Sequence, residues 1–247
     1  MRALLFVFCL LAGLPAQAGS VRVATASNFV PTMAALAKAF EADTGHRVDV
    51  MAGSSGAIYA QILQGAPFDM FLSADAARPA KLVDAKQAAP EHKATYALGA
   101  LALWSRKEVS FPDASTASAY LTALPPRQLA SANPATAPYG QAAQQTLLAL
   151  GVEPRQLVTG QNIGQAFSLV ASGNVDAGFV AASQLTSVTL GSIWRVPPSL
   201  HQPIQQDMVL LARARGNKAA KALFAWLQSP AARALIVKAG YSLPAQP

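Results

Sequence analysis

The sequence contains a single cysteine, Cys9, among its 247 residues. Cys9 lies inside an N-terminal apolar segment that has the features of a secretory signal peptide, so we expect the mature protein to contain no thiol. That expectation excludes a disulfide, a cysteine nucleophile and a cysteine-ligated metal. A lipid anchor would need a cysteine at the cleavage point, and Cys9 lies too early in the chain for that.

Charged side chains are also scarce. Asp, Glu, Lys and Arg together make up 13% of the sequence, whereas 52% of its residues are hydrophobic, and the formal net charge is +7. The basic residues are scattered, without a run of Lys or Arg interleaved with aromatic residues, so we do not expect a nucleic-acid partner. A weak positive field of this kind favours the approach of an anion.

No apolar run is long enough to cross a bilayer. The segment Leu4 to Leu14 is shorter than the ~20 residues that a membrane-spanning helix needs. It follows Arg2 and precedes Ala16-Gln17-Ala18, an A-x-A cleavage site, and this order is typical of a signal peptide. We therefore expect residues 1–18 to be removed and the remainder to be exported to the periplasm as a soluble protein that is not embedded in the membrane.

Strand and helix patterns alternate along the chain and predict parallel strands with helical crossovers. Val21 to Ala24 predicts a short buried strand, and Met33, Leu36 and Phe40 then recur at helical spacing before Gly45, which suits a helix C-cap. The same strand-then-helix pattern recurs in the following residues and starts again further along the chain, which indicates two β/α sets.

Two local features are predicted within these sets. Gln156 to Val158 predicts a short strand, and Asp75, at the end of the strand Phe68 to Leu72, suits the N-cap of the next helix.

Apolar segments join the two sets. A long apolar strand is predicted from Tyr96 to Trp104, and another, from Met208 to Ala212, leads back toward the first set. We therefore expect an α/β fold of two lobes, each a β/α sandwich, hinged by two crossovers. In this division residues 19–96 and 206–247 form lobe 1, and residues 97–205 form lobe 2.

Four predicted strand-to-helix loops contain small polar residues and no charged side chain. Two loops belong to each lobe, so they would line one cleft if the lobes face each other. The first turn of a helix offers free N–H groups and the positive end of the helix dipole, and both favour an anion. The four loops are Ser27-Asn28, Ser54-Ser55-Gly56, Pro138-Tyr139-Gly140 and Asn162-Ile163-Gly164.

The donors in these loops restrict the class of ligand. A metal cation requires carboxylates or imidazoles, and a carboxylate ligand usually requires an arginine fork, but the loops contain none of these groups. Neutral donors and helix dipoles can hold a compact, fully ionised oxyanion. They can reject protonated phosphate, because its proton would need an acceptor. Each loop alone is typical of an ordinary helix cap, and only the set of four indicates a binding site.

An exported hydrolase is an alternative use of the same cleft. Ser27 or Ser55 would need a neighbouring base to act as a nucleophile, and a G-x-S-x-G motif is absent around both. The histidines, His46, His92 and His201, lie in predicted turns or loops away from the four site loops. We therefore predict a binding protein with no catalytic residue, no metal-cation site and no cofactor. Another oxyanion, such as sulfate, is the alternative ligand.

Four longer stretches carry a family resemblance: residues 23–29 (VATASNF), 53–56 (GSSG), 65–75 (GAPFDMFLSAD) and 168–180 (SLVASGNVDAGFV). They resemble the periplasmic molybdate-binding proteins, the capture subunits of molybdate ABC importers, and the resemblance covers nearly the whole mature chain. It implies a type II periplasmic-binding-protein fold and molybdate or tungstate as the ligand. It also implies a membrane ABC permease as the partner, and we expect a monomer.

The resemblance assigns the anion contacts to the same four loops. Ser27 and Asn28 match the first oxyanion-binding loop, and Ser55 matches the serine of the second. Ile163 lies where a backbone N–H of an aliphatic residue reaches the anion. Selection against sulfate would then depend on cavity size, because the donors are of the same kind.

One position departs from the family pattern. Many members have a tyrosine in the loop after the Gly-Phe-Val strand, and this chain has Ala181 there. We expect Tyr139 to supply the phenol from another loop, as in the members with Asn-Phe after the first strand. Tyr139 therefore completes the predicted set of ligand-binding residues.

Overall fold

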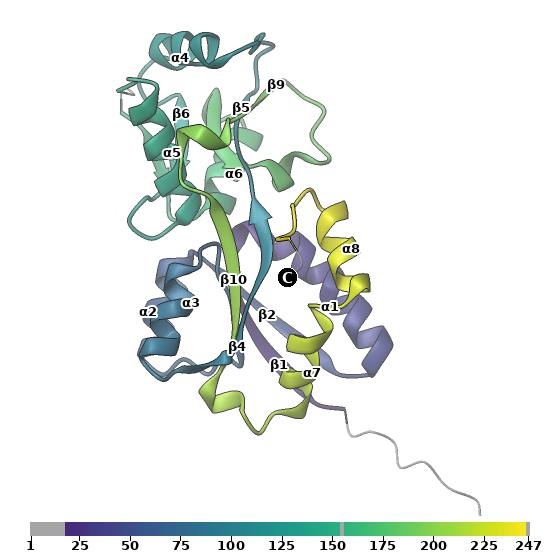
Figure 1. Cartoon of the computed structure of the whole chain (residues 1–247). Helices are drawn as coiled ribbons and strands as arrows, with labels where there is room; N and C mark the ends of the chain where they lie inside the picture. Colours follow the sequence, from purple (N-terminus) through teal and green to yellow (C-terminus); the bar gives the residue numbers. More distant parts are fainter. Residues whose placement is uncertain (1–17, 154–155, 246–247) are drawn as a thin grey trace, which may run out of the picture.

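The computed structural model describes residues 18–153 and 156–245, so the predicted signal peptide lies outside the described residues except for Ala18. The described chain forms two mixed five-stranded sheets with helices packed against them (Figure 1). None of the helices in these two ranges is both long enough and apolar enough to cross a membrane.

The first sheet has the strand order β2-β1-β3-β10-β4. Strand β1 pairs in parallel with β2 and β3, whereas β10 runs antiparallel to β3 and β4. The sheet therefore combines a parallel β/α part from the start of the chain with a strand that returns from the end. Its strands are β1 (Ser20–Ala26), β2 (Arg47–Gly53), β3 (Met70–Leu72), β4 (Ala88–Gly99) and β10 (Ile204–Leu211).

Helices cover both faces of the first sheet. Successive side chains of a strand point to opposite faces, so a strand that is apolar throughout needs a helix on each face to bury them. Val21 and Val23 of β1 belong to one apolar cluster with α1, α7 and α8, whereas Ala24 belongs to another with α2. Figure 1 shows α2 and α3 on one side of the sheet and α1, α7 and α8 on the other. These helices are α1 (Val30–Thr44), α2 (Ser55–Leu63), α3 (Ala77–Asp84), α7 (Lys218–Trp226) and α8 (Pro230–Lys238).

The second sheet has the order β7-β6-β8-β5-β9, and it too is covered on both faces. Leu101 and Leu103 of β5 pack in the cluster that holds α4 and α5, whereas Trp104 stacks on Phe167 of α6 with ring centroids 5.3 Å apart. The strands are β5 (Leu101–Ser105), β6 (Leu129–Ala132), β7 (Val158–Gly160), β8 (Ala177–Ala181) and β9 (Ser192–Arg195). The helices are α4 (Ala114–Ala123), α5 (Pro138–Ala149) and α6 (Ile163–Ala171).

Four short 3₁₀ segments complete the regular structure: η1 (Ser27–Phe29), η2 (Ala182–Leu185), η3 (Pro198–Leu200) and η4 (Ala212–Ala214). Segment η1 matters most for the site, because it joins the end of β1 directly to α1. The turn after α1 agrees with the sequence pattern, since Gly45 has a left-handed φ of 72° and its N–H bonds to the carbonyl of Glu41.

The predicted single strand from Tyr96 to Trp104 is wrong. The apolar run is divided between β4, which pairs with β10 in the first sheet, and β5, which pairs with β8 in the second. Only Ala100 separates the two strands, so the chain changes sheets without a polar loop to mark the change. The return passes from β9 to β10, and β4 and β10 lie side by side along the molecule (Figure 1).

Two smaller predictions also need correction. A strand at 156–158 is displaced to β7, because Gln156 has a φ of 51°, which is not an extended conformation. Asp75 was expected to be the N-cap of the next helix, but Ala76 occupies that position before α3. Asp75 still satisfies the helix terminus, because its Oδ1 accepts a hydrogen bond from Arg78 N at 2.8 Å.

Candidate functional site

One small cavity lies where the four polar loops meet, between the two sheets. Its volume is about 180 Å³ including its open mouth. All five ligand-binding residues predicted from the sequence line this cavity, so the fold brings together positions as distant in sequence as Ser27 and Ile163. The loop residues that line it are Ser27, Asn28, Ser54, Ser55, Pro138, Tyr139, Asn162 and Ile163.

Helices begin at this cavity from both sheets. Ser55 is the first residue of α2, Ile163 is the first of α6, and Tyr139 is the second of α5 after Pro138. The first N–H groups of a helix have no partner within the helix, so each of these residues has a backbone donor available. The positive ends of the three helix dipoles meet at the same place.

Two other loop residues have ordinary capping roles. The Ser54 hydroxyl accepts a hydrogen bond from Ala57 N at 3.3 Å, and the Asn162 side chain accepts one from Gln165 N at 3.0 Å. These bonds satisfy N–H groups deeper in the first turns and fix the start of α2 and α6. The helix termini are therefore held in place before any ligand is present.

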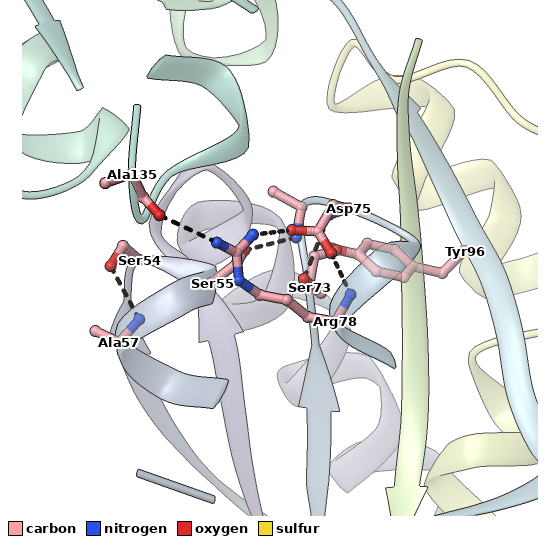
Figure 2. Close-up of polar contacts among 9 residues, drawn as sticks. Ser54, Ser55, Ala57, Ser73, Asp75, Arg78, Tyr96 and Ala135 are labelled. Atoms are coloured by element: carbon pink, nitrogen blue, oxygen red, sulfur yellow. Dashed lines mark hydrogen bonds and ion pairs between the residues drawn. The ribbon is translucent and has the colours of Figure 1, made fainter. Parts of the chain in front are cut away.

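The hydroxyl groups of Ser55 and Ser27 have an unused proton. The fully buried Ser55 Oγ accepts a hydrogen bond from Ala74 N at 2.9 Å (Figure 2). Ser27 Oγ likewise accepts one from Gly164 N at 3.2 Å. A serine hydroxyl both donates and accepts, so each side chain, with its oxygen fixed by a backbone N–H, can still donate to a ligand.

The cavity lining contains no carboxylate, ammonium, guanidinium or imidazole group. Asp75 and Arg78 lie beside the Ser55 loop and form an ion pair with each other (Figure 2). The Arg78 guanidinium also donates to the carbonyl of Ala135 at 3.4 Å, which lies across the cleft. This positive charge is therefore already paired, and any anion in the cavity would be held by neutral donors.

A buried polar network that was not predicted from the sequence lies behind the cavity. Gln206 of β10 accepts hydrogen bonds from the Asn28 amide at 2.9 Å and from the Tyr96 hydroxyl at 3.2 Å. The Asn28 amide also donates to the hydroxyl of Tyr241 at 3.1 Å, and that hydroxyl donates to the backbone carbonyl of Asn28 at 2.9 Å. The network fixes the first loop against the strands that join the sheets. A glutamine within the apolar strand β10 was the available signal.

Tyr139 belongs to the same network through its phenol. Its oxygen accepts a hydrogen bond from the Gln206 amide at 3.4 Å, and a Cβ built on Gly99 would lie only 2.3 Å from it. The phenol thus packs against β4 and β10, while the backbone N–H of Tyr139 lies at the start of α5. The idea that this phenol replaces the donor missing at Ala181 stays a prediction.

The tyrosines of the network are neutral over the ordinary pH range. Burial raises the pKa of Tyr96 and of Tyr139 well above the usual value for a phenol, and the neighbouring phenol of Tyr241 raises both further. Burial raises the pKa of Tyr241 to about 12, although the hydrogen bond that its hydroxyl accepts from the Asn28 amide lowers this pKa. No negative charge from this network opposes an anion in the cavity.

Two other features do not provide a better site. In the described part of the chain, no group of three or more His, Cys, Asp or Glu side chains could hold a metal ion. A larger hollow of about 710 Å³, including its mouth, lies beside α5. Apolar side chains such as Leu147, Leu148 and Val152 line much of it, and it has no convergence of helix termini.

Comparisons with known proteins identify the family of the chain. The family model described as bacterial extracellular solute-binding protein matches residues 21–242. The molybdate-binding protein ModA of Azotobacter vinelandii is 44% identical over 234 residues, 92% of either chain, and that of Rhodobacter capsulatus is 44% identical over 232 residues, 92% of this chain and 90% of its own. The solved Azotobacter vinelandii periplasmic molybdate-binding protein superposes with a TM-score of 0.83 at 39% identity, over 91% of this chain and all of that one.

Proposed function

The chain belongs to the bacterial extracellular solute-binding proteins, and from that premise we propose that its cavity captures molybdate, and tungstate with it, outside the cytoplasm. The observation on which this rests is the meeting of helix N-termini from both sheets at one cavity without a charged side chain. Neutral donors and helix dipoles match a compact oxyanion. The anion is bound and released unchanged, so the protein needs neither catalytic residues nor a cofactor.

Each predicted residue has a distinct role in this proposal. Ser55 and Ser27 donate their free hydroxyl protons, and Ser55 also offers its backbone N–H. Ile163 and Tyr139 offer backbone N–H groups at the start of α6 and α5. Asn28 contributes from the backbone, because its side-chain amide is used by Gln206 and Tyr241.

Delivery requires the anion to be released to a membrane permease of the ABC type, and we propose that the monomeric protein does so by opening. Residues 19–96 and 206–247 would move as lobe 1 and residues 97–205 as lobe 2, about the connections that lead into β5 and β10. The closed arrangement buries the anion between helix termini of both lobes. Opening removes half of the donors at once and so releases the ligand.

Calorimetric titration of the mature protein with molybdate, tungstate, sulfate and phosphate tests the proposal. We expect submicromolar dissociation constants for molybdate and tungstate, which correspond to a binding free energy on the order of −8 kcal/mol or stronger. Sulfate and phosphate should give no heat of binding. Tight sulfate binding without molybdate binding would move the protein to another oxyanion specificity on the same fold. No heat of binding from any of the four anions would mean that the loops are only helix caps.

A further inference from the structure

Two glycines donate hydrogen bonds across the cleft from the first turns of helices on opposite sides. Gly56 of α2 donates its N–H to the carbonyl of Thr136 at 2.8 Å. Gly164 of α6 donates its N–H to the hydroxyl oxygen of Ser27 at 3.2 Å. Each bond joins an element of one sheet to a loop of the other, so the pair holds the cavity closed from both sides.

Neither glycine is required by its backbone conformation, because neither has a left-handed φ. What requires glycine at position 56 is the closeness of the opposite lobe. A Cβ there would lie 2.9 Å from both Cα and O of Thr136 and 3.0 Å from Arg78 Nη2. Two of these atoms belong to the backbone, so they can withdraw only if the loop or the whole lobe moves.

Gly164 has the same relation to the other lobe, in a milder form. A Cβ there would lie 3.3 Å from Cβ of Ser27 and 3.2 Å from Oδ1 of Asn162. These contacts are tighter than usual but not prohibitive. Ordinary van der Waals contact begins near 3.4 Å, so a methyl group would displace the opposite side by about 0.5 Å at Gly56 and by about 0.1 Å at Gly164.

We propose that Gly56 and Gly164 are positioning residues that set how closely the two lobes approach, and thereby the size of the oxyanion cavity. This inference rests on the proposed function of that cavity. Each glycine directly follows a residue that lines the cavity, Ser55 in one case and Ile163 in the other. A methyl group at either glycine would therefore separate the donors of one lobe from those of the other.

Affinity for molybdate provides the first test, by calorimetry on Gly56→Ala, Gly164→Ala and Gly216→Ala. A Cβ on Gly216 would meet nothing within 4 Å, and its φ is not left-handed, so Gly216→Ala is the matched control. A donor that moves by about half an ångström leaves the hydrogen-bond range for N–H···O. We expect Gly56→Ala to weaken binding about tenfold or more, Gly164→Ala to weaken it less, and Gly216→Ala to bind like the wild type.

Lobe separation, measured both with molybdate and without it, provides the second test. Leu63 of lobe 1 and Leu148 of lobe 2 are 50% and 81% exposed, so Leu63→Cys with Leu148→Cys offers two labelling sites in a mature chain expected to have no other thiol. Pulsed electron spin resonance between spin labels at these positions reports their distance distribution. We expect Gly56→Ala to shift this distribution, and Gly216→Ala to leave it unchanged.

Melting temperatures of all variants show whether each is folded. Wild-type affinity and an unchanged distance distribution in folded Gly56→Ala would overturn the inference. If Gly56→Ala does not fold, Gly164→Ala takes its place. Wild-type affinity and an unchanged distance distribution in folded Gly164→Ala would then overturn the inference. Failure of the wild type to bind molybdate would refute the proposed function instead, and the distances between the labels would still test the role of the glycines.

Discussion

Ser55 illustrates how a single side chain prepares a site for an anion. Its oxygen accepts a hydrogen bond from Ala74 N, and its own backbone N–H lies at the first position of α2. The side chain is fully buried, so a ligand in the cavity would meet two donors already fixed in direction. Because Ser55 is already ordered, binding would cost little side-chain entropy at this residue. Its contribution to affinity should therefore be large.

The change Ser55→Ala removes the hydroxyl donor and leaves the backbone N–H. A hydrogen bond to a charged group contributes about 1.5–3 kcal/mol, so we expect molybdate affinity to fall roughly tenfold or more. Ser229→Ala is the matched control, because Ser229 also accepts a backbone hydrogen bond, from Ala232 N at 3.3 Å, but caps α8. Calorimetry should show weaker binding for Ser55→Ala alone. Equal affinity in the two variants would contradict the role given to Ser55.

The loop residues could be predicted from the sequence because their chemistry is local. A small polar residue between a strand and a helix lies next to the helix N-terminus, however the sheets are arranged. A glutamine in an apolar strand marks Gln206 as unusual, but the contacts of Gln206 and Gly99 with Tyr139 could not be predicted, because Tyr139 is distant in sequence. The positions of the predicted ligand-binding residues agree with one cavity, whereas their contact with an anion stays a prediction.

At the scale of elements, helices were more predictable than strands. Helix α1 follows its apolar spacing and ends at a left-handed Gly45. The run from Tyr96 to Trp104 was misassigned because the end of β4, with buried Tyr96 and Ala97, is as apolar as the fully buried β5. Hydropathy therefore does not change where one strand ends and the next begins. Partner choice in a sheet depends on the whole fold, and periodicity does not encode it.

The strands β4 and β10 place Tyr96 and Gln206 between the sheets, and this location gives a pH prediction. The folded-state pKa of Tyr96, Tyr139 and Tyr241 lies above the ordinary value of 10.0. Between pH 10 and about 12 the unfolded chain would therefore release protons that the folded chain retains. The free energy of unfolding is unaffected by these groups below pH 10 and falls as pH rises above it.

An alkaline titration that follows phenolate absorbance and circular dichroism together checks this expectation. We expect the three network tyrosines to ionise only as the fold is lost, above pH 10, and molybdate affinity to be constant between about pH 6 and pH 9. Tyr241→Phe should reduce the absorbance change that accompanies unfolding. Ionisation of all five tyrosines in the folded protein would show that the network is open to water.

At the scale of the whole molecule, the cavity belongs to neither sheet alone. Each sheet has its own apolar clusters on both faces, and the site exists only where helices from the two sheets meet. The two β/α sets and their crossovers could be inferred from the sequence. Their distance of approach could not, because it is determined by contacts such as Gly56 with Thr136 that involve backbone atoms.

A ligand that bridges two such units should stabilise the molecule as a whole. Binding to the folded state alone adds about 2.7 kcal/mol to the free energy of unfolding when the free anion is a hundredfold above its dissociation constant. For a chain of this size that corresponds to a rise in melting temperature of roughly 5–10 °C. At the same molybdate concentration, Ser55→Ala with tenfold weaker binding should gain only about 1.4 kcal/mol. Differential scanning calorimetry with molybdate and, separately, with sulfate measures both effects. An equal rise with sulfate would indicate a general ionic effect instead of a selective cavity.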